Sequence, residues 1–287
     1  MEPAIVCAML MGAGAFAQAQ DTVDARSSDG LAYDLVGEGP LVVLIHGTNL
    51  DRRMWDAEVG WLREQTRVLR YDLRGQGGSD FPTEPFSNHE GLIDLLSDLG
   101  EADVTLVGLS AGTQVALDVA LAAPELVARL VLVSPSIAGY APTVMPAFLS
   151  DLTTALRAGD FDGANEVLLA SSLMSAPSNR ARLVRTMVED NDRLWTIPYS
   201  LVEQMSPPAI DRLEEIDQPT LVLVGGQDEV AIREQGMLLE RRMGDARSTT
   251  IPGGHLLNLI SPAPFRQALS EFLGLSRERG APRAPTP

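Results

Sequence analysis

The sequence predicts an α/β fold, in which helices flank a mostly parallel central sheet and a helical cap is inserted into the sheet's sequence. Short apolar runs rich in Val, Ile and Leu alternate with stretches in which apolar residues recur every three or four positions. Such alternation is typical of right-handed βαβ crossovers, which build parallel sheets. The alternation breaks once, between about residues 136 and 210. With 287 residues, the chain is long enough for one domain with an inserted cap or for two modest domains.

The expected strands are continuous apolar runs, as in strands that are buried on both faces. The first, Gly30–Val36, leads into the turn Gly37-Glu38-Gly39-Pro40. The later ones are Leu41–Ile45, Val68–Tyr71, Val104–Val107, Leu130–Val133, Leu221–Val224 and Ser248–Ile251.

Helices are expected where apolar residues follow helical spacing, over Met54–Glu64, His89–Leu99, Ala111–Ala123 and Pro264–Leu273. Residues 136–210 contain no strand-like run and are rich in Leu, Met and Pro, so they form the expected cap. Residues 20–135 and 211–276 form the expected core. The proline-containing tail 277–287 is expected to be disordered.

The N-terminus resembles a signal peptide. Ala4–Ala17 is apolar, and Ala17-Gln18-Ala19 has the form of a signal-peptidase site. A helix of about 14 residues would be about 21 Å long, too short for the ~30 Å core of a bilayer, so no membrane span is expected. Glu2 stands where a basic residue is usual. We therefore expect export to the periplasm or medium if the leader 1–19 is cleaved near Ala19, and a cytoplasmic protein otherwise.

The composition excludes several classes of function. A net charge of −17 disfavours a nucleic-acid partner. All 22 basic residues are Arg, so lysine-based catalysis and a P-loop lysine are excluded. The single cysteine, Cys7, excludes disulfides and cysteine-ligated zinc in the body of the chain. We expect no metal and no cofactor. Oligomeric state is not predicted.

The segment Gly108-Leu109-Ser110-Ala111-Gly112 follows an expected strand and opens an expected helix. This is the context of a nucleophile elbow, in which small residues on both sides of a serine let the chain fold back sharply. The side-chain oxygen is then exposed at a helix N-terminus, where negative charge is stabilised. An ordinary tight turn is the alternative. We predict that Ser110 is a nucleophile.

A serine nucleophile needs a base, and three histidines are available. His255 follows a glycine pair in a loop between a strand and the last helix, a position from which an imidazole can reach the end of the sheet. His46 ends a strand and is expected to support the neighbouring loop. His89 begins a polar helix and is expected to be solvated. His255 is the predicted base.

Asp228 lies just beyond the end of a buried strand and can orient the imidazole, although a helix N-cap for Glu229–Leu239 is an alternative. The order Ser110, Asp228, His255 is that of the hydrolase elbow. The oxyanion hole needs two backbone donors, for which we predict the amides of Ala111 and Thr48, with Asn49 as the neighbouring option. The loop Asp72–Ser79 matches no phosphate-binding pattern and is expected to be a structural turn, with Asp72 and Arg74 bracing loops near the active site.

From about Leu31 to Leu275 these ordered features resemble the α/β-hydrolase superfamily: His46-Gly47 after a strand, the Asp72–Ser79 loop, the Ser110 elbow, a cap, Asp228 and then His255. The segment Leu50–Asp56 looks like that of 3-oxoadipate enol-lactonases and related small-ester carboxylesterases. The resemblance implies an esterase, a lactonase, a C–C bond hydrolase or a perhydrolase. A serine at the elbow argues against the haloalkane dehalogenases and epoxide hydrolases.

We therefore expect a serine hydrolase that cleaves a small, largely apolar ester or lactone. The alternatives are C–C bond hydrolysis or perhydrolysis on the same triad, and a non-hydrolytic ligand-binding member of the fold. The candidate pocket residues are Asn49 and four cap residues, Met145, Phe148, Trp195 and Met205. Further apolar cap side chains, about a third of which we expect to face substrate, are Leu152, Leu156, Leu168, Leu173 and Met174.

Overall fold

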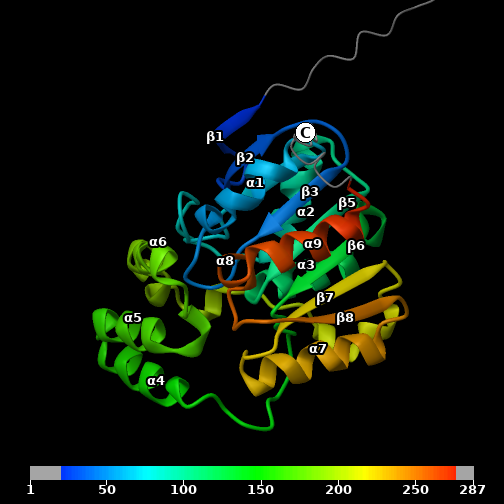
Figure 1. Ribbon diagram of the computed structural model, residues 1–287. Coiled ribbons are helices and arrows are strands. Elements are labelled where there is room, and N and C mark those ends of the chain that lie inside the picture. The colour runs from blue at the N-terminus through cyan, green and yellow to red at the C-terminus, as the bar shows by residue number, and fades with distance from the viewer. Residues whose placement is uncertain (1–20, 276–287) are drawn as a thin grey trace, which may run out of the picture.

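The structure is a computed structural model that describes residues 21–275 (Figure 1). The predicted leader 1–19 and the predicted tail 277–287 lie outside the described residues. Export and the disorder of the tail therefore stay predictions. None of the helices within residues 21–275 combines the length and the apolar character needed to cross a bilayer.

One eight-stranded sheet forms the centre of the molecule, in the order β1-β2-β4-β3-β5-β6-β7-β8 (Figure 1). The pairs β1–β2 and β2–β4 are antiparallel, and every later pair is parallel. The strands are β1 Thr22–Arg26, β2 Ala32–Val36, β3 Leu41–Ile45, β4 Arg67–Tyr71, β5 Val104–Leu109, β6 Val127–Val133, β7 Thr220–Gly225 and β8 Ala246–Ile251. The mostly parallel sheet is therefore confirmed.

Helices cover both faces of this sheet. The strands alternate their side chains between two cores: Val43 and Ile45 of β3 pack on one side, and Val42 and Leu44 on the other. The first core includes residues of α2 Asn88–Leu99, α3 Ala111–Ala122 and α7 Val230–Arg242. The second includes residues of the short 3-10 helix η1 Arg52–Trp55, α1 Asp56–Leu62, α8 Leu257–Ile260 and α9 Pro262–Leu273.

The predicted insertion is confirmed as helical between residues 148 and 196. It contains three α-helices, which Figure 1 shows grouped together beside the sheet, and short 3-10 turns. Val184, Met187 and Val188 of the insertion pack into the second core, so the insertion is anchored to the sheet domain. The flanking residues Ile137 and Ala209 belong to the first core. The helices are α4 Phe148–Ala158, α5 Phe161–Ala170 and α6 Ser178–Asp190, and the 3-10 turns are η3 Ser172–Met174 and η4 Asp192–Thr196.

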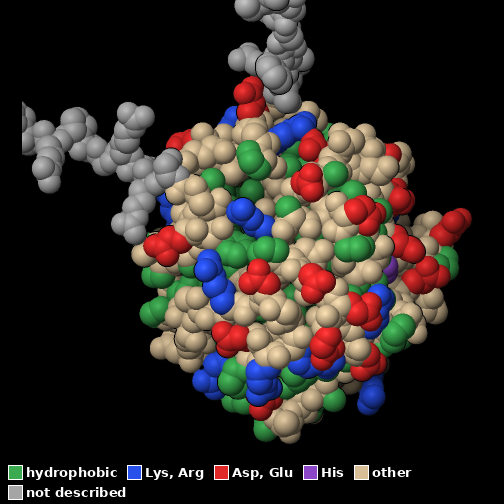
Figure 2. All heavy atoms as spheres, turned by 90° about the vertical axis from the view of Figure 1, so that its right-hand side faces the viewer, with side chains coloured by type: hydrophobic (Ala, Val, Ile, Leu, Met, Phe, Trp, Pro, Cys, Tyr) green, Lys and Arg blue, Asp and Glu red, His purple; other side chains and the backbone are tan. Residues whose placement is uncertain are grey.

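Charged side chains of both signs share the surface. Figure 2 shows both acidic and basic groups over one face, with several basic groups near its lower edge. Since acidic residues outnumber basic ones by 39 to 22, a polyanion would be repelled.

Candidate active site

Ser110 lies at a sharp strand-to-helix turn. Strand β5 ends at Leu109, helix α3 begins at Ala111, and Ser110 between them has φ +54° and ψ −117°. A non-glycine residue in such a conformation is strained by about 1–3 kcal/mol, and strain of this kind gathers at functional sites. The backbone amide of Ser110 donates to the carbonyl of Val133 at 3.0 Å, which fixes the turn to the neighbouring strand.

Two glycines make this turn possible. A Cβ on Gly108 would lie 2.3 Å from the carbonyl oxygen of Gly112, and a Cβ on Gly112 would lie 2.4 Å from the carbonyl oxygen of Ile45. Both distances are far below van der Waals contact, and the atoms met are backbone. The strand–turn–helix geometry and the close contacts match a nucleophile elbow rather than an ordinary tight turn.

His255 and Asp228 form a buried pair. The imidazole Nδ1 of His255 lies 3.0 and 3.1 Å from the two carboxylate oxygens of Asp228. The side chains are only 3% and 1% exposed, so water does not weaken the contact. With its proton held on Nδ1, the ring keeps Nε2 as its basic nitrogen.

The backbone on both sides of this pair is also held. The hydroxyl of Ser134 donates to the carbonyl oxygen of His255 at 2.7 Å. The amide of Glu229 donates to Asp228 at 2.8 Å, but helix α7 begins at Val230 and its N-cap residue is Glu229. Asp228 is therefore not the N-cap of α7, and orienting His255 is the role that its contacts favour.

The other two histidines have different surroundings. The buried His46 contacts the carbonyl of Gly47 through Nδ1 at 2.8 Å and accepts from the amide of Leu73 through Nε2 at 2.9 Å, so it supports these loops. His89 was expected to be solvated, and that expectation is wrong. It is half-buried, and its Nδ1 lies 2.7 Å from the hydroxyl of Ser87. Burial lowers the pKa of His89, opposed by the charge of Glu90.

The predicted oxyanion donors lie beside Ser110. Asn49 donates its backbone amide to Oε1 of Gln76 at 2.8 Å, so this amide already has an acceptor. Within residues 21–275, no such acceptor is recorded for the amides of Thr48 and Ala111. Between the two options at the turn, the geometry therefore favours Thr48. Gln76 belongs to the Asp72–Ser79 loop, so this loop shapes the oxyanion turn.

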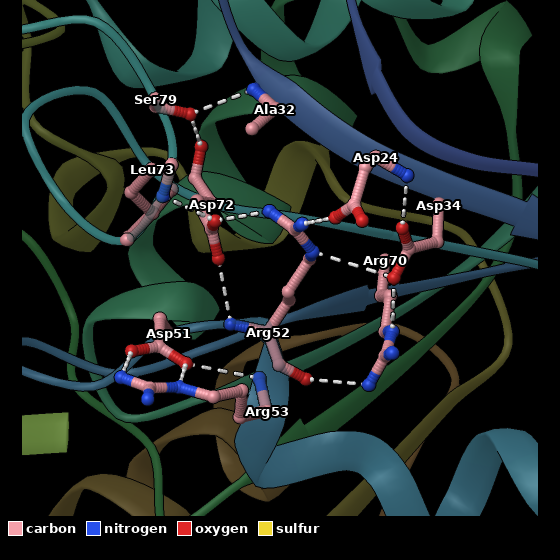
Figure 3. Close-up of polar contacts among 12 residues, drawn as sticks. Asp24, Ala32, Asp34, Asp51, Arg52, Arg53, Arg70, Asp72, Leu73 and Ser79 are labelled. Atoms are coloured by element: carbon pink, nitrogen blue, oxygen red, sulfur yellow. Dashed lines mark hydrogen bonds and ion pairs between the residues drawn. The ribbon is translucent and has the colours of Figure 1, made fainter. Parts of the chain in front are cut away.

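A network of charged side chains braces the same loops (Figure 3). Asp72 accepts from the backbone amide of Arg52 at 2.7 Å and from that of Gly78 at 2.8 Å, and it also pairs with the Arg52 guanidinium. Figure 3 shows Arg52 between Asp24, Asp34 and Asp72. The bracing predicted for Asp72 is therefore observed, and Arg52 is a partner that the sequence did not single out.

Arg74, the other residue predicted to brace loops near the active site, pairs with Asp29. Its contact therefore ties the loop to the turn before β2.

Ser110 and His255 line one cavity of about 200 Å³. Its walls come from the oxyanion turn, the end of β5 and the helical insertion, so the insertion covers the carboxyl end of the sheet. The lining residues are Gly47, Thr48, Asn49, Leu50, Leu109, Ser110, Phe148, Leu149, Leu152, Leu168, Leu173, Met174, Trp195 and His255.

Three of the five predicted pocket residues, Asn49, Phe148 and Trp195, line this cavity. The structure places the other two elsewhere. Met145 precedes α4 and is 62% exposed. Met205 lines a separate hollow and contacts the Arg212 guanidinium through its sulfur at 3.6 Å.

Some of the further apolar cap residues also reach the cavity. Leu152, Leu168, Leu173 and Met174 line it, whereas Leu156 does not. The sequence did not single out Leu149. Its position directly after Phe148 at the start of α4 was the available signal.

The described residues contain no cluster of three or more His, Cys, Asp and Glu side chains suited to a metal ion. The cavity brings together the hydroxyl of Ser110 and the imidazole of His255, which Asp228 contacts.

Several solved structures are similar to this chain in fold. A hydrolase from Pseudomonas aeruginosa PA01 is 30% identical, with a TM-score of 0.71 over 87% of this chain and 97% of that one. A thermophilic esterase from Thermogutta terrifontis is 26% identical, with a TM-score of 0.72 over 89% and 98%. The enol-lactonase from Burkholderia xenovorans LB400, at 22% identity, has a TM-score of 0.71 over 85% and 96% and supports the fold alone.

Among curated relatives, an uncharacterized protein of Mycobacterium bovis is 40% identical over 106 residues. That match covers 36% of this chain and only 31% of the relative's length. The model described as the alpha/beta hydrolase family matches residues 42–268, a range that contains the elbow, the insertion and the His255–Asp228 pair. The chain therefore belongs to the alpha/beta hydrolase family.

Proposed function

We propose that the protein is a carboxylic ester hydrolase that cleaves small, largely apolar esters or lactones through an acyl-enzyme on Ser110. The proposal depends on one observation. Ser110, which has a strained backbone at the strand-to-helix turn, lines the same cavity as His255, whose imidazole contacts the buried carboxylate of Asp228. This is the arrangement by which a serine hydroxyl becomes nucleophilic at neutral pH.

In the first step, Oγ of Ser110 attacks the carbonyl carbon of the ester while Nε2 of His255 takes the hydroxyl proton. Asp228 stabilises the resulting imidazolium. The amides of Thr48 and Ala111 donate to the oxyanion, and losing one such donor typically costs about 3 kcal/mol, or roughly a hundredfold in rate. The bond from carbon to the leaving oxygen then breaks, and His255 returns its proton to the alkoxide.

In the second step, His255 removes a proton from a water molecule, whose oxygen attacks the acyl carbon. The bond from that carbon to Oγ of Ser110 breaks, the acid leaves, and Ser110 regains its proton from His255. A lactone would follow the same two steps, with the alcohol and the acid leaving as one molecule.

The cavity supports a small, apolar acyl group. Its volume of about 200 Å³ is only somewhat larger than the ~150 Å³ cavity that accommodates benzene. Leucine, methionine and aromatic side chains from the insertion make up most of its wall. Such a wall favours an uncharged acyl group of one ring or a short chain over a charged one. The esterase from Thermogutta terrifontis, at 26% identity, is consistent with this class.

Labelling with a fluorophosphonate probe, followed by mapping of the adduct, tests the proposal directly. We expect a single adduct on Ser110 that is lost in Ser110→Ala. It should persist in Ser97→Ala, which removes an exposed serine of α2. Short-chain p-nitrophenyl esters should be hydrolysed with a burst by the parent and by Ser97→Ala only.

Each other outcome has a distinct meaning. Labelling without turnover of any ester or lactone would favour a non-hydrolytic ligand-binding protein. Turnover confined to C–C bonds, or to peracid formation from hydrogen peroxide, would favour the alternative chemistries. Equal ester hydrolysis by Ser110→Ala and the parent would contradict the assignment of Ser110.

A further inference from the structure

A buried polar cluster lies between helix α8 and the segment η1–α1. The side-chain amide of Asn258 donates to the carbonyl oxygen of Met54 at 2.9 Å and to Oε2 of Glu58 at 3.3 Å. Asn258 is 1% exposed and Glu58 is 2% exposed, and Met54 is fully buried. These contacts are therefore shielded from water and from salt.

The cluster joins the two segments that would set the geometry of the reaction. Asn258 lies in α8, three residues after His255. Met54 lies in η1, the short helix that follows the oxyanion turn at Thr48. The bond between Asn258 and Met54 spans 204 positions of the sequence and connects the loop of the predicted base with the loop of a predicted oxyanion donor.

Stability alone gives a poor account of this cluster. It lies against the second core, next to Trp55 and Leu257. Oδ1 of Asn258 and Nε1 of Trp55 are buried, and no partner is recorded for either among residues 21–275. An unpaired buried polar atom costs about 1–3 kcal/mol, and well-packed apolar side chains in its place are often neutral or stabilising. A role in positioning explains why polar residues occupy this place.

We propose that Asn258 and Glu58 are positioning residues, which hold the His255 loop and the oxyanion turn at a fixed separation. The proposal rests on the hydrolytic function proposed above. Neither side chain touches the reacting atoms. They act through Met54 and α8, and a displacement of about 1 Å between catalytic groups can lower the rate about a hundredfold.

The charge of Glu58 makes this positioning depend on pH. The pKa of Glu58 is raised to about 7, mainly by burial and slightly by the neighbouring charge of Asp56, against the opposing effects of the bond from Asn258, a backbone hydrogen bond and the charge of Arg180 on α6. An ionised carboxylate accepts a hydrogen bond about twice as strongly as a neutral group. The contact with Asn258 therefore strengthens as the pH rises through neutrality.

Two variants test the proposal, both in the full-length protein. Asn258→Leu keeps the size of the side chain and removes its donor, and Glu58→Gln fixes position 58 in a neutral form. Asp118→Asn is the matched control. It removes another buried carboxyl group whose pKa is raised to about 7, on the far side of the sheet from the cluster.

For Asn258→Leu we expect kcat for a short p-nitrophenyl ester to fall by about 10- to 100-fold while KM changes less than about threefold. For Glu58→Gln we expect kcat close to the parent's at pH 6 and about fivefold lower at pH 8.5, since only the parent gains the charged acceptor. Asp118→Asn should keep the parent's pH profile. The rate at which a fluorophosphonate labels Ser110 should fall in parallel for the first two variants.

The labelling rate separates the two proposals, since it needs no ester turnover. If the parent is labelled on Ser110 but hydrolyses no ester, the proposed function fails, and the labelling rates of the variants still decide on the positioning residues. If Asn258→Leu unfolds at a lower temperature but keeps the parent's kcat and labelling rate, the cluster is structural only. The same conclusion follows if Glu58→Gln retains the pH profile of the parent. A parent that is not labelled at all would overturn both.

Discussion

Asp118 gives the sharpest prediction about stability. It lies in α3 and is 7% exposed, and no partner is recorded for its buried Oδ1 within residues 21–275. Burial raises its pKa from 3.8 to about 7, opposed by the charge of Arg212. The folded state therefore binds this proton more tightly than the unfolded state does. Between these two pKa values the folded state carries more protons, so its stability falls as pH rises, and the loss is complete above about pH 7.

The size of the effect follows from the shift. About 1.4 kcal/mol per pKa unit gives a penalty that grows from about 2 kcal/mol at pH 5.5 to about 4 kcal/mol at pH 8.5. Asp118→Asn removes the titration and keeps the shape of the side chain. We expect the variant to exceed the parent in free energy of unfolding by these amounts at the two pH values, as upper limits.

Urea unfolding followed by tryptophan fluorescence at pH 5.5, 7.0 and 8.5 measures the difference. The series begins at pH 5.5 because the isoelectric point is about 4.5, where the protein would carry no net charge and would tend to precipitate. Asp94→Asn, at an exposed position of α2, is the control and should show no such trend. A gain of equal size at all three pH values, or a loss at each, would refute the assignment of a raised pKa to Asp118.

Three further predictions concern the active site. Gly108→Ala should abolish ester hydrolysis and lower the melting temperature, because its Cβ would lie 2.3 Å from a backbone oxygen. In contrast, Gly60→Ala in α1 should stabilise the protein by about 0.5–1 kcal/mol, because a Cβ there would meet nothing within 4 Å beyond its own helix backbone and chain neighbours. Asp228→Asn should lower kcat by about 10⁴ with KM little changed, since the imidazole loses its oriented tautomer; a loss below tenfold in steady-state assays would contradict this. Trp195→Ala should shift the preference among p-nitrophenyl esters toward longer acyl chains, and an unchanged chain-length profile would exclude Trp195 from the acyl site.

Most of the sheet could be predicted from the sequence, because strands buried on both faces appear as uninterrupted apolar runs. The missed strand, β1 Thr22–Arg26, has the sequence TVDAR and lies at the edge, where only one neighbour supplies hydrogen bonds. Its residues are intermediate or exposed, so burial left no apolar pattern to find. The helical nature of the insertion was predictable from its composition, but its packing against the sheet was not.

The residues of the site also differ in how well the sequence predicts them. Ser110, Asp228 and His255 could be proposed because each lies at the end of a recognisable strand. Met145 and Met205 were misplaced, since helical spacing and composition do not say which side of the insertion faces the sheet. The ion pairs of Arg52 with Asp34 and Asp72 join segments that are far apart in the sequence, so no local sequence pattern predicts them.

Glu58 did have a signal in the sequence. It falls three residues after Trp55 and four before Leu62, so helical spacing places it on the apolar side of α1. A glutamate at such a position indicates a buried carboxyl group that has a hydrogen-bond partner inside the protein.

The buried carboxyl groups of Glu58 and Asp118 are expected to make stability and activity depend on pH in opposite directions. Burial raises the pKa of both Glu58 and Asp118 to about 7, so both lower the stability of the folded state as the pH rises toward neutrality. Only Glu58 contacts a residue next to the His255 loop, so only its charge also strengthens the proposed positioning. We therefore expect kcat to rise still over a pH range in which the melting temperature already falls. At pH 8.5, Glu58→Gln should make the protein more stable and less active. Asp118→Asn should make it more stable with unchanged activity.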